Sequence, residues 1–169
     1  LSPLTDGLLS SNAGGFLSRH FLDSGYAAVE IAGESDELIA IHVSDEGVEF
    51  EAVLELEQRS VPETVEYLRS ERGVDADQTA VVGPAGENRV RFASIRTTEE
   101  RAFGRGGLGA VLGAKGVKAI TFSGDSPPDV QMPPEQMEIH REAATEDHVM
   151  KQQGTVAVMD LANELNGLP

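Results

Sequence analysis

Glycine and arginine are concentrated in the stretch EERAFGRGGLGAVLGAKGVKAI, which runs from residue 99 to residue 120. Six of the eighteen glycines of the chain lie between Gly104 and Gly116. Glycine lets backbone N–H groups approach a ligand closely, and arginine forms bidentate contacts with phosphate oxygens. The stretch therefore indicates a site for an anionic ligand.

The local charge supports this interpretation. Residues 86–120 carry seven basic side chains against three acidic ones, although the whole chain has a formal net charge of −16. The basic residues are Arg89, Arg91, Arg96, Arg101, Arg105, Lys115 and Lys118. The alternative is that these side chains only pair with nearby carboxylates.

The same stretch contains a literal G-x-G-x-x-G at Gly104, Gly106 and Gly109. A dinucleotide-binding fingerprint requires a buried strand before its first glycine and an acidic residue about 20 positions further on. Here the polar sequence TTEERAF precedes the first glycine, and the acid at that spacing, Asp125, lies in a proline-rich stretch. This context argues against a nucleotide-binding module, which we keep as the less favoured alternative for residues 104–109.

The elements that must position this stretch follow from hydrophobic period, turn residues and caps. For residues 61–72 the helix signals agree, because Ser60 is a candidate N-cap, Pro62 falls in the first turn and Gly73 follows the end. A shorter helix is expected over residues 16–23. Strands are expected over residues 27–33, 37–44, 47–53, 79–83, 89–96 and 117–124, with a turn at 84–88.

A proline-rich stretch, DSPPDVQMPP, marks a change in the character of the chain. Before it the pattern is α+β, and after it the apolar residues have a helical period. We therefore expect an α+β domain over residues 1–124, a linker over 125–133 and the beginning of a helical domain over 134–169. Within the last part, helices are expected over residues 134–154 and 155–167.

Composition excludes several classes of protein. The chain has 29 acidic and 13 basic residues and no cysteine. It lacks the broad basic face that nonspecific nucleic-acid binding requires, and by itself it cannot hold a cysteine-ligated cluster. No apolar run approaches the length of a membrane span, and no signal peptide is evident. We expect a cytoplasmic protein without nucleic-acid or membrane partners.

Five separated blocks of the sequence occur in the order of one known family. They are SNAGG (11–15), GYAAVEIAG (25–33), VVGPAGENRVRFASI (81–95), RAFGRGGLGAVLGAKGVKAI (101–120) and QGTVAVMDLANELNGLP (153–169). With these blocks the chain resembles the N-terminal domain and the start of the helical domains of the aldehyde:ferredoxin oxidoreductases, which are tungstopterin enzymes.

The resemblance implies an α+β fold in which two β-sheets, related by a pseudo-two-fold, form a base for two pterins, followed by the start of an all-α domain. In this family the two molybdopterin-type cofactors hold one tungsten or molybdenum, and a magnesium ion bridges their phosphates. The helical domains carry a [4Fe–4S] cluster. The enzymes oxidise an aldehyde to a carboxylic acid and pass the electrons to ferredoxin. The resemblance leaves a homodimer open.

By the same resemblance, the chain is a segment of such an enzyme that contributes the pterin-binding base and no catalytic residue. The first strands of the domain are expected before Leu1, and the ligands of the cluster after Pro169. The chain alone is therefore expected to be inactive. A noncatalytic remnant or interaction domain of the same family is the alternative.

Six residues in two of the blocks correspond to cofactor-binding positions of the family. They are Asn12 and Gly14 in the first block and Arg101, Ala102, Gly104 and Arg105 in the fourth. The resemblance implies that the backbone carbonyls of Asn12 and Ala102 bind the bridging magnesium. Magnesium prefers hard oxygen ligands and accepts cofactor phosphates beside few protein groups, so the assignment is chemically consistent.

Each of these residues also has a purely structural interpretation. Asn12 can cap a helix that starts near Gly14, and Arg101 can pair with Glu99 or Glu100. The later glycines of the stretch, Gly109 and Gly113, are expected to allow close helix packing rather than to contact a ligand.

The acidic composition generates a prediction about salt. Residues 28–72 contain thirteen acids and three arginines, and the whole chain has only three lysines, a pattern that also suits a protein adapted to high salt. Because salt screens the repulsion among these carboxylates, the free energy of unfolding should rise as KCl increases to molar concentration. Urea titrations at several KCl concentrations measure this dependence, and a flat or falling stability would reject it.

Overall fold

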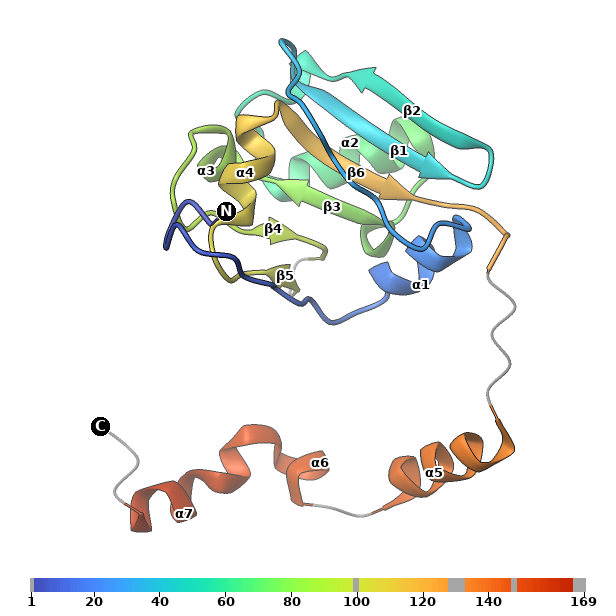
Figure 1. The fold of residues 1–169 in the computed structure, drawn as a ribbon, viewed down its shortest axis with the longest axis vertical. Helices are drawn as coiled ribbons and strands as arrows, with labels where there is room; N and C mark the ends of the chain where they lie inside the picture. Colours follow the sequence, from blue (N-terminus) through green and yellow to red (C-terminus); the bar gives the residue numbers. More distant parts are fainter. Residues whose placement is uncertain (1, 99–100, 128–132, 147–148, 166–169) are drawn as a thin grey trace. The chain divides into compact units, whose positions relative to one another are not determined.

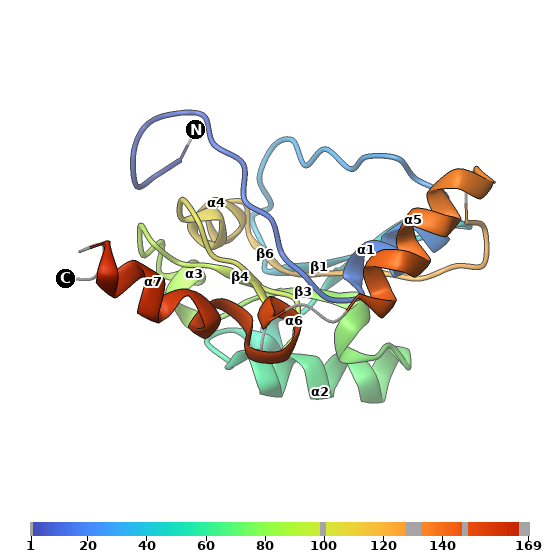
Figure 2. The same cartoon turned by 90° about the horizontal axis from the view of Figure 1, so that it is seen from below.

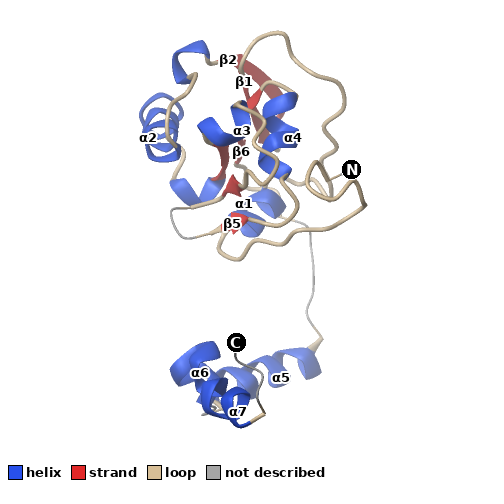
Figure 3. Ribbon diagram, turned by 90° about the vertical axis from the view of Figure 1, so that its left-hand side faces the viewer, coloured by secondary structure: helices blue, strands red, loops and turns tan. Residues whose placement is uncertain are grey.

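The structure of the protein is a computed structural model that describes residues 2–98, 101–127, 133–146 and 149–165. The chain divides into two compact units, Leu1–Pro128 and Asp129–Pro169. Within the described residues, the first unit contains all the strands and the second contains helices only (Figures 1 and 3). No described helix is long and apolar enough to cross a lipid bilayer.

Six strands of the first unit form one mixed sheet in the order β2-β1-β6-β3-β4-β5 (Figure 1). β1 pairs with β6 in parallel, and all other neighbours pair antiparallel. β1, β6 and β3 occupy the centre and are mostly buried, whereas β2 and β5 form the edges. The strands are β1 (Ile39–Ser44), β2 (Gly47–Ala52), β3 (Thr79–Val82), β4 (Ile95–Arg96), β5 (Ala102–Phe103) and β6 (Val117–Phe122).

Helices cover both faces of this sheet (Figure 2). α1 (Leu17–Asp23) and α4 (Leu108–Ala114) lie on one face, and α2 (Val61–Arg72) lies on the other. Successive residues of a strand point to opposite faces. Ile41 therefore packs in the core with α1 and α4, while its neighbour Ala40 packs in the core with α2. The predicted α+β class is confirmed.

α2 begins and ends at the residues that its sequence signals predict. The Glu63 N–H donates to Ser60 Oγ (3.4 Å), and the Ser60 N–H donates to the Glu63 carboxylate (2.8 Å), which is a capping box. Pro62 occupies the first turn, and Gly73 ends the helix in left-handed backbone with φ 66°. Because these contacts are local, the sequence alone is sufficient to predict both ends. Single 3₁₀ turns lie at Leu54–Leu56 and Ala76–Gln78.

Of the predicted strands, one is absent and another is shortened to two residues. Residues 27–33 form no strand, since they pair with none of the described strands and residues 27–30 are exposed. Residues 84–88, predicted as a turn, contain the short helix α3 (Pro84–Glu87). Only the last two residues of the predicted strand 89–96 form one, because the Val90 N–H donates back to the Ala85 carbonyl (2.8 Å) in a turn after α3. The described strands form one sheet, whereas the resemblance implied two.

A lysine is fully buried in the middle of the sheet. Lys118 lies on β6 where the register with β1 shifts, and its Nζ donates to the Arg59 carbonyl (2.8 Å) and pairs with the Glu87 carboxylate. The Gln58 N–H also donates to Glu87 (2.8 Å). The pair thus connects β6, α3 and the segment that precedes α2. Lys118 is not available to a ligand, so the charge count of the sequence overstates the anion site.

Removal of this lysine tests the importance of the pair. Lys118→Met leaves the Glu87 carboxylate buried without its partner, so we expect the free energy of unfolding to fall by about 3–5 kcal/mol. Lys115→Met is the matched control, because Lys115 Nζ donates only to the Gly33 carbonyl (2.8 Å) and its loss should cost about 1 kcal/mol. Urea unfolding followed by circular dichroism measures both, and equal losses would contradict a dominant role of the buried pair.

The second unit is helical but more divided than predicted. The predicted helix over residues 134–154 is interrupted at Glu146, whose backbone is extended, and it ends at Gly154, whose φ of 61° is left-handed. The predicted end of the last helix at Gly167, like part of the linker (residues 128–132), lies outside the described residues. The elements are α5 (Pro134–Thr145), α6 (Val149–Gln153), a 3₁₀ turn (Gly154–Val158) and α7 (Met159–Glu164).

Apolar side chains of this second unit are exposed. Met137 and Ile139 on α5 and Leu161 on α7 are each more than half exposed, and neither helix buries a residue. Helices with this pattern gain stability only when an apolar surface covers them. The described part of the second unit therefore contains no hydrophobic core of its own.

Candidate functional site

The N-terminal segment (residues 2–15) runs beside β5 and the glycine loop (residues 104–107) (Figure 1). The Arg105 N–H donates to Ser11 Oγ (3.1 Å), although the two residues are 94 positions apart. The side chain of Arg101 lies against Gly14 and Gly15: a β-carbon would be 3.7 Å from Arg101 Nη1 at Gly14, and 3.4 Å from Arg101 Cγ at Gly15. The structure therefore brings together the SNAGG and RAFGR blocks.

Hydrogen bonds hold the start of this segment on the glycine loop. The hydroxyl of the buried Ser2 donates to the Gly106 carbonyl (2.7 Å). Arg91 Nε–H donates to the Pro3 carbonyl (2.7 Å). Sequence reasoning did not single out Ser2 and counted Arg91 as a ligand candidate, because the partners of both lie about 90 or more positions away and leave no local signal. Arg91 is a structural residue here.

In the glycine loop, protein atoms occupy the space where a β-carbon would stand at Gly106 and at Gly107. A β-carbon on Gly106 would lie 2.1 Å from a Leu9 methyl, and one on Gly107 would lie 2.0 Å from the Arg91 carbonyl oxygen. Both glycines also have left-handed backbone, with φ of 80° and 76°. Gly104 alone in the loop has open space where a β-carbon would stand. The G-x-G-x-x-G spacing therefore reflects packing of the N-terminal segment, and it does not form a cradle for a dinucleotide.

The helix that follows the loop is fixed by a second glycine contact. A β-carbon on Gly113 of α4 would lie 2.0 Å from the Gly86 carbonyl oxygen of α3, and one on Gly86 would lie 2.7 Å from the Gly109 carbonyl oxygen. The two backbones can approach this closely only because no side chain intervenes. The expectation that Gly109 and Gly113 serve helix packing is confirmed.

The guanidinium groups of Arg101 and Arg105 differ from those on the acidic part of the surface. Arg101 and Arg105 are exposed, and among the described residues no carboxylate lies within ion-pair distance of either. By contrast Arg59, Arg69 and Arg72 pair with carboxylates on the acidic part of the surface. The proposed partners Glu99 and Glu100 of Arg101 lie outside the described residues. Two positive groups beside the open side of Gly104 suit an anionic ligand.

Asn12 does not cap a helix. α1 begins at Leu17 with Phe16 as its N-cap residue and no side-chain cap, so the structural interpretation of Asn12 is wrong. Asn12 is exposed and stands at an apolar cavity of about 330 Å³, which Phe103 and Phe21 also line. Apolar contacts at this cavity hold β5 and the N-terminal segment on the core. The exposed Asn12 side chain makes no hydrogen bond to the described residues.

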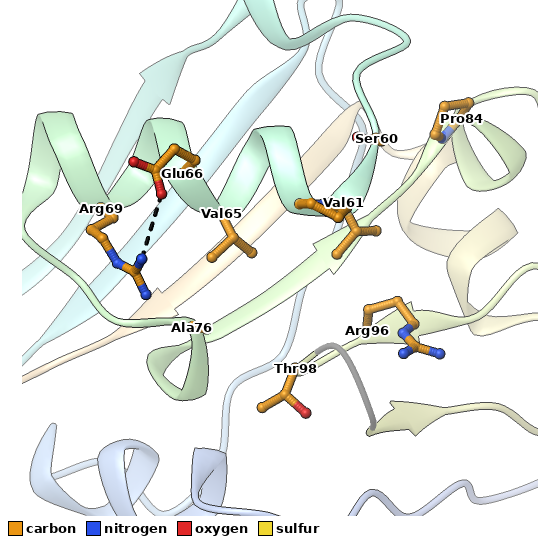
Figure 4. Close-up of a pocket in the computed structure, with 10 residues that line it drawn as sticks. Ser60, Val61, Val65, Glu66, Arg69, Ala76, Pro84, Arg96 and Thr98 are labelled. Atoms are coloured by element: carbon orange, nitrogen blue, oxygen red, sulfur yellow. Dashed lines mark hydrogen bonds and ion pairs between the residues drawn. The ribbon is translucent and has the colours of Figure 1, made fainter.

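A larger hollow lies on the opposite face of the sheet. This groove of about 1250 Å³ runs between α2 and the ends of β3 and β4, and Val61, Val65, Pro84, Arg96 and Thr98 are among its lining residues (Figure 4). It contains none of the six residues predicted to bind the cofactor. The six residues lie instead in the N-terminal segment, in β5 and its flanks and in the glycine loop, which are joined by the contacts described above.

Comparison with known proteins agrees with the motif blocks. The family model described as aldehyde ferredoxin oxidoreductase, N-terminal domain, matches residues 1–124. The chain belongs to the aldehyde ferredoxin oxidoreductase family. The tungsten-containing aldehyde ferredoxin oxidoreductases of Pyrococcus horikoshii and Pyrococcus furiosus are 35% and 34% identical to it, over 96% and 99% of the chain. The aliphatic sulfonate oxidoreductase WOR-like subunit of Pyrococcus furiosus is 30% identical over 75% of the chain.

A solved structure with the same fold also belongs to this comparison. The active site complex BamBC of benzoyl coenzyme A reductase, in complex with 1,5-dienoyl-CoA, matches with a TM-score of 0.73 and 34% identity over 79% of the chain. The chain spans 28% of the length of the Pyrococcus horikoshii relative and 20% of the BamBC chain. This solved structure therefore has the same fold, although its name records a substrate other than an aldehyde.

Two glycines of the loop allow a direct test of the packing. Gly107→Ala combines left-handed backbone with a clash against the Arg91 carbonyl, so we expect the free energy of unfolding to fall by about 2 kcal/mol or more. Gly104→Ala meets open space and should change it by less than about 1 kcal/mol. Thermal and urea unfolding of the two variants measure the difference. Equal destabilisation would show that Gly107 is not packed against the Arg91 carbonyl as described.

Proposed function

We propose that this chain forms the pterin-binding base of a tungsten-containing oxidoreductase of the aldehyde ferredoxin oxidoreductase family. The contact between the N-terminal segment and the glycine loop carries the proposal. It joins the segment that contains Asn12 and Gly14 to the part of the chain that contains Arg101, Ala102, Gly104 and Arg105, through the contact of Arg101 with Gly14 and the bond of Arg105 to Ser11. The tungsten-containing relatives, matched over almost the whole chain, support the class of cofactor.

The residues present fit a phosphate-bearing pterin. Arg101 and Arg105 offer guanidinium groups without carboxylate partners in the described part of the chain, and Gly104 leaves room for a group to approach the backbone. Such groups bind phosphate or pterin oxygens through charge-assisted hydrogen bonds. Asn12 and Ala102 lie in the two adjoining blocks, and their backbone carbonyls would supply oxygen ligands to a magnesium ion between the phosphates. Tungsten is preferred over molybdenum because the relatives named for a metal contain tungsten.

In this proposal the chain binds and orients the cofactor and contributes no catalytic residue. The bound tungsten centre would supply the two-electron oxidation of an aldehyde to a carboxylic acid, the substrate class in the names of the tungsten-containing relatives. Since the chain has no cysteine, a [4Fe–4S] cluster that passes electrons to ferredoxin would be held by other parts of the protein. The role of the described residues is to fix the cofactor on a rigid sheet.

The test measures cofactor content in the full-length protein. Arg101→Gln and Arg105→Gln each remove charge-assisted hydrogen bonds worth about 1.5–3 kcal/mol, so the tungsten and pterin retained after dialysis should fall about tenfold or more. Arg69→Gln is the matched control, because Arg69 is an exposed arginine on α2, which covers the other face of the sheet. Elemental analysis and fluorescence of the oxidised pterin measure the content.

Three other results of these measurements would contradict the proposal, and each supports a different conclusion. Retention of full tungsten and pterin in the Arg101 and Arg105 variants would overturn the proposed site. A full-length protein that never contains tungsten or pterin would instead support the alternative, a noncatalytic member of the family. Binding of NAD or ATP in calorimetry, abolished by a change at Gly104, would support the nucleotide-binding alternative.

A further inference from the structure

One buried hydroxyl next to the candidate site has no partner. Thr97 is 1% exposed, and within the described part of the chain its Oγ1 makes no hydrogen bond. Other buried threonines are satisfied: Thr79 Oγ1 donates to the Ala76 carbonyl (2.8 Å), and Thr64 Oγ1 donates to the Ser60 carbonyl (2.9 Å). A buried polar group without a partner lowers stability, so such groups call for a reason other than folding.

The sheet register places this hydroxyl opposite Arg101. β4 and β5 pair Ile95 with Phe103 and Arg96 with Ala102, and the Thr97 N–H continues the ladder by donating to the Arg101 carbonyl (3.0 Å). Residues directly opposite each other in antiparallel strands have their side chains on the same face, with β-carbons about 5 Å apart. The side chains of Thr97 and Arg101 therefore leave the hairpin on one face.

That face is the one with the candidate site. Arg96 and Thr98, the neighbours of Thr97, line the groove beside α2 (Figure 4), whereas Ile95 lines the cavity at Asn12 on the other side. Alternation along the strand thus directs Thr97 away from the groove and toward the N-terminal segment. Arg101, on the same face, already lies against Gly14 and Gly15.

We propose that Thr97 is a positioning residue whose hydroxyl accepts a hydrogen bond from the Arg101 guanidinium when the cofactor is bound. This inference rests on the proposed function. A guanidinium has five N–H donors, and bidentate contact with a phosphate uses two of them. The Thr97 hydroxyl is an unused acceptor beside Arg101, and it fixes the orientation in which the remaining donors meet the anion. The unpaired hydroxyl of the free protein is thereby satisfied in the bound state.

The proposal predicts that one variant, Thr97→Val, keeps or raises the stability of the cofactor-free protein and weakens cofactor binding in the holoenzyme. Thr97→Val keeps the shape of the side chain and removes only the hydroxyl. In the full-length protein produced without tungstate, its midpoint of thermal unfolding should stay unchanged or rise by a few degrees, because an unsatisfied group is lost. In the holoenzyme, the tungsten and pterin retained after stepwise dialysis should fall about tenfold. Thr97→Ser, which restores the hydroxyl, should retain the cofactor at the wild-type level.

Thr79→Val is the matched control. Thr79 is equally buried but its hydroxyl is already bonded, so this variant should lower the unfolding midpoint and leave the cofactor content unchanged. If Thr97→Val destabilises the free protein as Thr79→Val does, the hydroxyl is structural and the proposal is overturned. Unchanged cofactor retention in Thr97→Val overturns it equally.

A double variant separates this inference from the proposed function. Because Thr97 acts through Arg101, adding Thr97→Val to Arg101→Gln should cause no further loss of cofactor. A further tenfold loss would overturn the route through Arg101. If Arg101→Gln alone has no effect on cofactor content, the proposed function itself fails. If Arg101→Gln has its expected effect and Thr97→Val does not, only the role of Thr97 fails.

Discussion

The backbones of α3 and α4 meet at Gly86, Gly109 and Gly113, where no β-carbon fits between them. α3 is in turn tied to the centre of the sheet, since its Glu87 carboxylate pairs with the buried Lys118 of β6. The glycine loop leads directly into α4, so its position depends on both contacts. A side chain at any of these glycines, or loss of the lysine, would displace the loop from the N-terminal segment.

In this arrangement a strongly acidic chain has two neighbouring arginines without a carboxylate partner among the described residues. Elsewhere in the described residues arginines such as Arg59, Arg69 and Arg72 are neutralised by carboxylates of the surface. Arg101 directly precedes the short strand β5, and Arg105 lies in the glycine loop that follows it. Fixing two cations beside an open backbone position costs little reorganisation when an anion binds, which is the physical advantage of a preformed site.

The N-terminal segment completes the site without being part of the sheet. A buried hydrogen bond of Ser2 and an exposed one of Arg91 anchor its start, and Ser11 anchors its middle to the backbone of Arg105. Gly14 and Gly15, further along the segment, lie against the Arg101 side chain. The family relationship spans this whole region, while the chain covers only 28% of the length of a full tungsten-containing relative.

The sequence by itself determined the features that depend on local contacts. The ends of α2 follow from Ser60, Glu63 and Gly73, and the central strands follow from their apolar runs, because caps and hydrophobic period act within a few residues. Motif order was also sufficient to identify the family, since the blocks are read along the chain.

Only the tertiary structure decided which charges and glycines are available to a ligand. The sequence makes Lys118 a candidate cation of the site, but in the structure it is buried against Glu87. The sequence also includes Gly106 in a ligand-binding motif, but Leu9 fills the space beside it. Two further features could not be predicted from the sequence. Residues 27–33 form no strand, and the Thr97 hydroxyl has no partner among the described residues. Each depends on partners that are distant in sequence, and the position of such partners is set by packing, which a linear pattern does not encode.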